Sequence, residues 1–347
     1  MRWTTCVCTC AALVLCLLLA GCARHAQTYR IQGQVFGTVA EVTIYGEPLE
    51  RAQILGKRVF DEFNRLHRKL HAWRPSELTT LNECIARGER CRTDSEMIYL
   101  LKSAALLSER SGDTFNPAIG HLLRLWGFQS DQPSGRAPSR EEIARWTRAD
   151  PRMSDLRYEG DYVWSVNSAV MLDLGGYAKG YALDEAARVL RSEKVRAALI
   201  NVGGNILAIG RPGERPWVVG IQDPRREGAV AQVELHDNEA IGASGDYRRY
   251  FMSGGERRTH IIDPRTGQSV DLAASVTIIV SSGEDAGLRS DGYSKPLFVV
   301  GPRGWREMAA QLGVKDALLI DTHGEMHATS SMLARMNAHR EHDVPRA

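Results

Sequence analysis

The residues best suited to chemistry gather around a glycine pair, Gly175 and Gly176. An acidic residue, Asp173, precedes the pair and follows an apolar run at residues 170–172 that predicts a strand, and an amphipathic helix pattern follows the pair. Glycine lets the backbone approach a ligand closely, and the free N–H groups at a helix N-terminus suit phosphate. The stretch predicts a phosphate or nucleotide site, with an ordinary tight turn as the alternative. The G-x-G-x-x-G fingerprint with its flanking strand and helix is absent, as is the P-loop motif.

The spacing of apolar residues outlines the elements that must position this turn. Strands are expected at about residues 34–45, 197–202, 217–221, 230–235 and 275–281. Helices are expected at residues 49–70, 140–146, 285–294 and 304–312, and from an Asp94 cap to residue 111. Residues 131–138 predict a loop, and residues 244–247 and His260 fall on what read as neighbouring strands. This mixed order indicates an α+β fold rather than a regular doubly wound sheet.

Composition excludes some classes of partner. The 347 residues carry a formal net charge of +2, with no long charge run and no Lys/Arg stripe interleaved with aromatic residues. No nucleic-acid partner is therefore expected.

The start of the chain predicts a processing signal. The apolar run at residues 11–20 is too short for a membrane span, which needs about 20 residues. The sequence Leu19-Ala20-Gly21-Cys22 then matches a lipoprotein processing box, with an ordinary secretory signal as the alternative. We expect lipidation at Cys22 and a membrane anchor facing the periplasm of a bacterial envelope. Ala23 in place of Asp favours the outer membrane, although inner and outer membranes both stay open.

This interpretation divides the chain into four parts. They are a signal peptide at residues 1–21, a tether at 22–33, a catalytic domain at 34–335 and a C-terminal tail at 336–347. Apart from Cys22, the processed chain keeps Cys84 and Cys91, which form either a disulfide in an oxidising compartment or two free thiols. A metal site at these cysteines is not expected, because no histidine or further cysteine lies near them.

Short motifs that recur in order along the chain resemble the ApbE family of flavin transferases. They occupy residues 36–38, 73–78, 112–117, 125–128, 173–184, 200–205, 219–224, 243–247 and 260–267. The resemblance implies an ApbE-like α+β fold of mixed sheets with flanking helices, with an FAD cleft between two sub-domains.

The resemblance also implies a function. The activity would be that of an FAD:protein FMN transferase, which moves FMN from FAD to a Thr or Ser hydroxyl of an exported flavoprotein and releases AMP with help from magnesium. Acceptors would be exported subunits of redox-driven ion pumps or respiratory regulators. Two alternatives remain open: a non-catalytic periplasmic FAD carrier, and an FAD pyrophosphatase that passes FMN to water.

The family motifs imply which residues contact FAD. These residues are Phe36, Trp73, Thr114, Phe115, Asn116, Asp173, Ser244 and His260. Phe36 and Trp73 stand where the family usually has Met and Tyr, so the flat apolar surface is kept; simple core packing is the alternative. Asn116 stands where Asp is usual and loses the charge. His260 is expected to be catalytic as a proton carrier, because histidine titrates near neutrality.

The family's metal motif departs from its usual form in this chain. By resemblance, the Gly176 carbonyl and Asp291, the second expected catalytic residue, bind magnesium, together with a Thr four residues after the Asp. Lys295 stands at that Thr position, and an ammonium group cannot ligate a metal. Three outcomes are open: magnesium held by Asp291, Gly176 and water; Lys295 in place of the cation; or flavin binding without transfer. His67 and His71, four apart on a helix, lack a third ligand and predict no metal site.

Overall fold

The structure is a computed structural model that describes residues 27–132, 135–281 and 283–342. The expected signal peptide and the lipidation site Cys22 lie outside these residues. Within the described ranges, no helix is both long and apolar enough to cross a membrane.

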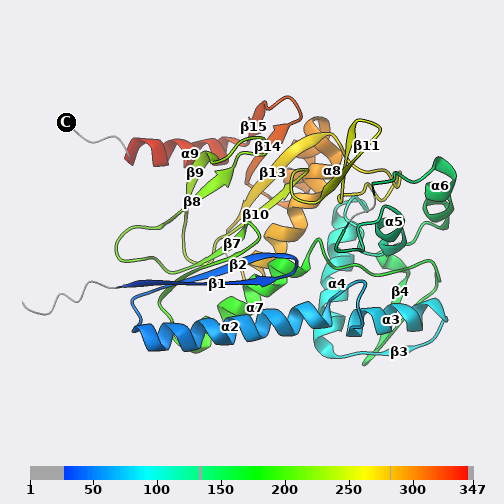
Figure 1. The fold of residues 1–347 in the computed structure, drawn as a ribbon, viewed down its shortest axis with the longest axis horizontal. Coiled ribbons are helices and arrows are strands. Elements are labelled where there is room, and N and C mark those ends of the chain that lie inside the picture. Colours follow the sequence, from blue (N-terminus) through cyan, green and yellow to red (C-terminus); the bar gives the residue numbers. More distant parts are fainter. Residues whose placement is uncertain (1–26, 133–134, 282, 343–347) are drawn as a thin grey trace, which may run out of the picture.

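An eight-stranded antiparallel sheet forms the centre of the larger half of the molecule (Figure 1). Its order is β1 (Thr28–Val35), β2 (Thr38–Tyr45), β6 (Ala197–Val202), β7 (Asn205–Ile209), β10 (Ala240–Gly245), β13 (Ala273–Val280), β14 (Asp316–Asp321) and β15 (Met326–Ala328). Every residue of β13 and of β14 is buried, so both faces of the sheet are covered there. Successive side chains point to opposite faces, and Ile278 and Ile279 accordingly join different apolar clusters.

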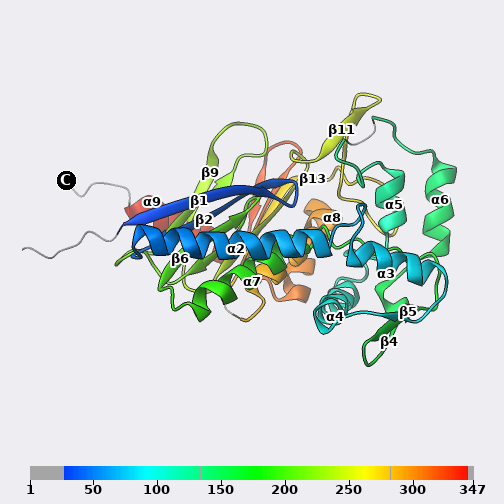
Figure 2. The ribbon, with the colours of Figure 1, turned by 60° about the horizontal axis from the view of Figure 1, so that its bottom comes forward.

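Helices and a β-ribbon cover the two faces of this sheet. Three helices pack on one face, namely α2 (Leu49–Lys69), α7 (Ala178–Ser192) and α8 (Ala286–Leu312). The other face carries the ribbon of β8 (Trp217–Gln222) and β9 (Ala229–Leu235) together with α9 (Ser330–His342). Figures 1 and 2 show α2 and α7 side by side beneath β1 and β2. The sheet therefore sits in the middle of three layers.

The smaller half consists of short helices and strands (Figure 2). Its helices are α3 (Glu77–Ala86), α4 (Ser95–Arg110), α5 (Gly120–Leu125), α6 (Arg140–Ala149) and the 3₁₀ turn η1 (Met153–Asp155). Its strands form a sheet of β3 (Cys91–Arg92), β5 (Tyr162–Ser165) and β4 (Leu156–Glu159) and a hairpin of β11 (Tyr250–Ser253) and β12 (Glu256–Thr259). A disulfide joins Cys84 of α3 to Cys91 of β3. The Trp126 indole N–H donates to the Gly267 carbonyl at 2.8 Å and ties α5 to the loop after the hairpin.

Helices α7 and α8 cross in close contact at two glycines. A Cβ atom on Gly180 would lie 2.3 Å from the Gly287 carbonyl oxygen and 2.6 Å from the Asp291 Cβ. The reverse substitution at Gly287 would meet the Gly180 carbonyl oxygen at 2.5 Å. Only glycine permits this approach, and it brings Asp291 of α8 to the N-terminal turn of α7.

A second contact fixes the start of α8. The Asp184 carboxylate of α7 accepts hydrogen bonds from the backbone N–H groups of Gly287 at 2.8 Å and Leu288 at 2.7 Å. The first N–H groups of a helix have no partner within that helix, so this buried carboxylate supplies one from the neighbouring helix. Burial raises the pKa of Asp184 to about 7, against the opposing effect of these N–H donors.

The α+β fold and most of the predicted elements are confirmed. The helix expected at residues 49–70 is α2, the cap at Asp94 accepts from the Met97 N–H at 2.8 Å, and the expected strand at 197–202 is β6. The helices expected at 285–294 and 304–312 both lie within α8, on either side of a kink at Gly301, whose φ of 63° and ψ of −164° are not helical.

Some expectations about strands are wrong. Residues 170–172 form no strand: Met171 makes one isolated bridge to Ile119. The Asn82 side chain instead accepts a hydrogen bond from the Leu172 N–H at 2.7 Å and donates one to the Leu172 carbonyl at 2.9 Å. A neighbouring strand would use these same backbone groups. His260 follows the hairpin strand β12, whereas Ser244 lies on β10 of the large sheet, so the two are not on neighbouring strands.

The element bounds also differ from the expected division of the chain at both ends. Strand β1 begins at Thr28 and pairs with β2, so it starts inside the expected tether at 22–33. Helix α9 runs across the expected domain end at residue 335.

Removing the Asp184 carboxylate is expected to destabilise the α7–α8 pair. Asp184→Ala leaves two buried N–H groups unpaired, which costs about 2 kcal/mol of unfolding free energy. Because the pKa of Asp184 is raised, the folded state binds its proton more tightly than the unfolded state, and this stabilisation declines as the pH rises through about 7. The loss measured by urea unfolding should therefore be larger at about pH 5 than at about pH 8.

Asp61→Ala is the matched control, since Asp61 is an exposed helix aspartate that pairs with Lys57 on its own helix. It should change stability by no more than about 0.5 kcal/mol. Equal losses in the two variants would contradict the capping role of Asp184.

Candidate active site

Asp173 fixes the backbone of the glycine turn. One carboxylate oxygen of Asp173 accepts the Gly175 N–H at 2.9 Å, and the other accepts from the Gln129 side chain at 2.9 Å. The Asp173 N–H donates to the Pro117 carbonyl at 2.8 Å. Asp173 therefore shapes the loop that leads into α7, and Gln129, which the sequence reasoning missed, fixes its second oxygen.

A buried carboxylate with two ammonium groups lies beside this turn. Asp291, whose side chain is fully buried, pairs with Lys295 through one carboxylate oxygen and with Lys179 at 3.7 Å through the other. The second oxygen also accepts the Gly180 N–H at 2.9 Å. Lys179 in turn donates to the Gly175 carbonyl at 3.3 Å. The site therefore carries one negative and two positive side chains at the N-terminus of α7.

The titration of this cluster reflects its burial. Burial lowers the pKa of Lys295 to about 8, although the Asp291 carboxylate opposes the shift. Burial alone would raise the pKa of Asp291, but the charges of Lys179 and Lys295 and the Gly180 N–H outweigh it, so that pKa is lowered. Asp291 is therefore a carboxylate at neutral pH.

Ser244 supports Asp291 from β10. The hydroxyls of Ser244 and Ser294 lie 2.7 Å apart, and the Ser294 hydroxyl donates to the Asp291 carbonyl at 2.8 Å. Both serines are buried. Ser244 thus fixes α8 in place, and its hydroxyl has protein partners.

The predicted residues 114–116 build the wall opposite the glycine turn. The Thr114 hydroxyl donates to the Ser111 carbonyl at 2.8 Å. The Asn116 amide donates to the Pro151 carbonyl at 2.8 Å and accepts the Ala118 N–H at 3.0 Å. An ionised Asp could not donate the first of these two bonds, which explains why an amide suits this position. Phe115, held between them, lies 3.8 Å from the position of a Cβ on Gly176.

A row of aromatic rings runs from Phe36 to Trp73. The ring of Phe36 packs edge-on against His67 with centroids 5.3 Å apart, His67 packs on His71 at 5.1 Å, and His71 packs on Trp73 at 4.5 Å. Burial lowers the pKa of both histidines, so they serve as neutral rings. The Trp73 indole N–H has no hydrogen-bond partner among the described residues, and the Arg249 guanidinium lies 5.6 Å from the Trp73 ring. The spacing of the two histidines in the sequence does not predict this ring packing.

A cavity of about 510 Å³ opens beside Trp73. Its walls include Asn82, His121, Arg124 and Met171. Because Asn82 also holds the backbone at Leu172, the cavity adjoins the loop that carries Asp173. The Trp73 ring with its unpaired indole N–H therefore lies beside this cavity, and the cavity adjoins the loop that leads to the glycine turn.

His260 is anchored by Arg249. The His260 Nδ1 lies 3.1 Å from the Arg249 carbonyl, which can only accept, so Nδ1 carries the proton and Nε2 is free to accept. The Arg249 guanidinium donates to the Phe128 carbonyl at 2.7 Å. Burial lowers the pKa of His260 to about 3, with further lowering by the charges of Arg249, Lys179 and Lys295. Desolvation and the three nearby cations therefore favour the neutral ring, whereas the sequence alone predicts a ring that titrates near neutrality.

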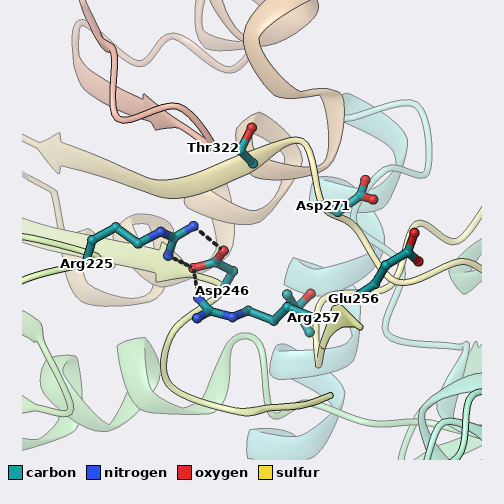
Figure 3. Close-up of a pocket in the computed structure, with 7 residues that line it drawn as sticks. Arg225, Asp246, Glu256, Arg257, Asp271 and Thr322 are labelled. Atoms are coloured by element: carbon teal, nitrogen blue, oxygen red, sulfur yellow. Dashed lines mark hydrogen bonds and ion pairs between the residues drawn. The ribbon is translucent and has the colours of Figure 1, made fainter. Parts of the chain in front are cut away.

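A second, smaller cavity of about 320 Å³ lies near the hairpin and is drawn in Figure 3. Arg225 grips both carboxylate oxygens of Asp246 at 2.6 and 2.7 Å, and Arg257 donates to the same carboxylate at 3.2 Å. Glu256 and Asp271 line the side of this cavity (Figure 3). The carboxylates of Asp246, Glu256 and Asp271 together offset the charges of the two arginines at this cavity.

Lys179 and Arg249 are the functional residues that sequence reasoning missed. Lys179 stands within the glycine stretch, three residues after Gly176, which was a usable signal. Arg249 follows residues 244–247 but had no motif role of its own, and only the three-dimensional path of the loop to β11 brings it to Trp73 and His260.

Known proteins share this architecture. A model of the ApbE family matches residues 36–319. The solved ApbE protein of Thermotoga maritima superposes with a TM-score of 0.81 at 29% identity, covering 89% of this chain and 99% of that one. The flavinyl transferase ApbE of Pseudomonas stutzeri, in its apo form, superposes at 0.77 and 29% identity, covering 90% and 97%.

Relatives in sequence carry a consistent name. A Rhodobacter capsulatus protein named FAD:protein FMN transferase is 40% identical over 304 residues, which are 88% of this chain and 57% of that protein. This chain thus spans a little more than half of that relative's length. A protein of the same name from Vibrio cholerae is 29% identical over 297 residues, which are 84% and 86% of the two chains. The fold and the site define the class of flavin transferases. Within that class, this chain belongs to the ApbE family.

The His260 ring is expected to stay neutral across the physiological range. With a pKa of about 3, its NMR signals should not shift between about pH 5 and pH 8, and they should show the Nδ1–H tautomer. The signals are assigned by their loss in His260→Gln. The urea-unfolded chain is the control, because the same ring should titrate near 6.5 there. An inflection between about pH 5 and pH 8 in the folded chain would show that the ring is protonated as first expected.

Proposed function

We propose that this chain is an FAD:protein FMN transferase that acts on exported flavoproteins. The observation that carries the proposal is the pair of lysines, Lys179 and Lys295, at the glycine turn that leads into α7. A third cation, Arg249, lies beside the Trp73 ring at the end of the aromatic row. A flavin needs flat apolar surface, and its pyrophosphate needs positive charge and N–H donors. The names of the ApbE relatives support the same activity.

The proposed reaction exchanges one P–O bond for another. The hydroxyl oxygen of a Thr or Ser in the acceptor attacks the phosphorus that carries riboflavin, and the P–O bond to the AMP half breaks. The products are a phosphodiester on the acceptor, AMP and the proton of the hydroxyl. Lys295 and Lys179 offset the negative charge that develops on the phosphates. The free Nε2 of His260 accepts a hydrogen bond from the attacking hydroxyl and so orients its oxygen, and the proton is released to solvent.

The magnesium implied by the family resemblance does not fit the described residues. Its expected ligands are the Gly176 carbonyl, the Asp291 carboxylate and a Thr hydroxyl. Both Asp291 oxygens already face cations or an N–H group, and the Thr position holds Lys295. No step of the proposed transfer therefore runs through a metal.

The products distinguish the transferase from its two rivals. Detergent-solubilised full-length chain is incubated with FAD and an exported flavoprotein subunit of a redox-driven pump, and the acceptor is weighed by mass spectrometry. A mass gain equal to one FMN, with one AMP released per acceptor, is the expected result. Free FMN with AMP would favour the pyrophosphatase, and intact FAD bound to the protein would favour the carrier. An acceptor with its Thr changed to Val is the control and should gain no mass.

We further propose that the chain is lipid-anchored to the bacterial envelope through Cys22 and faces the periplasm. The Leu19-Ala20-Gly21-Cys22 sequence and the Cys84–Cys91 disulfide support this proposal, because disulfides persist in oxidising compartments. Cys22→Ser should release the protein from the membrane fraction and block signal processing, whereas Cys16→Ser, within the segment to be removed, should change neither. Unchanged membrane association of Cys22→Ser would contradict the anchor.

A further inference from the structure

Resting on the proposed function, we propose that Lys295 is the resident cation of this site: its ammonium group takes the place of a divalent metal ion, so this chain neutralises the pyrophosphate of FAD without one. The usual metal motif of the family predicts the opposite, and the inference depends on where this side chain lies and what it contacts.

The Lys295 side chain runs from α8 across the glycine turn. Its Cε and Cδ atoms lie 3.6 and 4.0 Å from the position that a Cβ on Gly176 would take. Its ammonium donates to the Asp291 backbone carbonyl at 2.8 Å and pairs with the Asp291 carboxylate. The side chain is only 13% exposed. Lys295 is therefore a fixed part of the site and is packed between the two expected metal ligands, Gly176 and Asp291.

The two Asp291 carboxylate oxygens, which a magnesium ion would need, already have partners. One Asp291 oxygen pairs with Lys295, and the other accepts the Gly180 N–H at 2.9 Å and faces Lys179 at 3.7 Å. The Lys179 ammonium group also donates a hydrogen bond to the Gly175 carbonyl at 3.3 Å. A divalent ion would have to displace ammonium groups from both the carboxylate and the glycine turn.

The charge balance opposes a divalent ion as well. Asp291 contributes one negative charge and the two lysines that face it contribute two positive charges, so these three residues together are positive before any ligand enters. The Asp173 carboxylate at the same turn is bonded to the Gly175 N–H and to Gln129. A doubly charged cation would be repelled by both ammonium groups in a buried setting, where screening is weak. A pyrophosphate anion would be attracted by the same groups and by the N-terminus of α7.

The packing around Asp291 fixes the position of its carboxylate beside the Lys295 ammonium group. The α7–α8 crossing at Gly180 and Gly287 holds the carboxylate against the Gly180 N–H, and the Ser294 hydroxyl holds its backbone carbonyl at 2.8 Å. Lys295 follows Asp291 by four residues, so both lie on the same face of α8. The ammonium group is thus placed by the helix itself, in the way that a bound ion is placed by its ligands.

Metal binding by the protein alone tests the inference without any reaction. Mn²⁺, which is visible by electron paramagnetic resonance and takes the same oxygen ligands as Mg²⁺, is titrated into the full-length chain. The wild type should leave millimolar Mn²⁺ free. Lys295→Thr, which restores the usual hydroxyl, should bind one ion with an affinity at least about tenfold higher. Tight Mn²⁺ binding by the wild type that Asp291→Asn abolishes would overturn the proposal, and this measurement needs no Lys295 variant to fold.

Lys57→Thr is the matched control. Lys57 pairs with Asp61 in the same i, i+4 arrangement on α2, but both side chains are exposed. The same substitution there should change neither Mn²⁺ binding nor transfer. Lys295→Arg keeps the positive charge and should exclude Mn²⁺ as the wild type does, so metal binding by this variant would also count against the proposal.

Transfer measured with and without a chelator separates this inference from the proposed function. Wild-type FMN transfer should persist within about twofold in excess EDTA, while Lys295→Thr should lose at least about tenfold in EDTA and recover with Mg²⁺. Wild-type transfer that EDTA abolishes and Mg²⁺ restores would overturn the inference but leave the proposed function standing. If no variant transfers FMN under any condition, the proposed function fails, and the Mn²⁺ titration still decides whether Lys295 excludes the metal.

Discussion

The close crossing of α7 and α8 is the constraint on which the rest of the site depends. Two helices whose axes carry side chains at the crossing stay about 8–10 Å apart, and the paired glycines Gly180 and Gly287 allow direct backbone contact instead. That contact places the Asp291 carboxylate on the first turn of α7 and the Asp184 carboxylate on the first turn of α8. Each helix therefore caps the other, and the glycine turn, the lysines and the anion site take their positions from this reciprocal arrangement.

The fold was largely predictable from local pattern, and the failures have physical causes. Long amphipathic stretches such as α2, and strands with clear apolar runs such as β6, were predicted closely because their periodicity is strong. Residues 170–172 carry an equally apolar run, but the amide of Asn82, 90 residues away, takes the hydrogen bonds that would have made it a strand. The two predicted helices meet at a kink within α8, because Gly301 takes a non-helical backbone conformation and Pro302 after it has no N–H to donate.

Some of the residues that gather at the glycine turn were predictable from sequence, but their roles were less so. The glycine turn is approached by four of the predicted residues, Asp173, Phe115, Asp291 and Lys295. The polar side chains of three others form hydrogen bonds with neighbouring protein atoms instead, namely those of Thr114, Asn116 and Ser244. The protonation of His260 could not be read from sequence, because it depends on burial and on three cations from distant parts of the chain. The same holds for His67 and His71: a spacing of four predicts a shared helix face, but only packing shows that the face meets Phe36 and Trp73.

The disulfide between Cys84 and Cys91 depends on the compartment in which the chain folds. It closes a loop of only a few residues, so in a chain-entropy account it restricts the unfolded chain by about 2.5 kcal/mol at most. A reducing cytosol keeps such thiols apart, and an oxidising space joins them. Two populations of the same sequence, one folded before and one after translocation, would thus differ by a covalent bond at α3. The presence or absence of this bond would therefore show in which compartment each molecule folded.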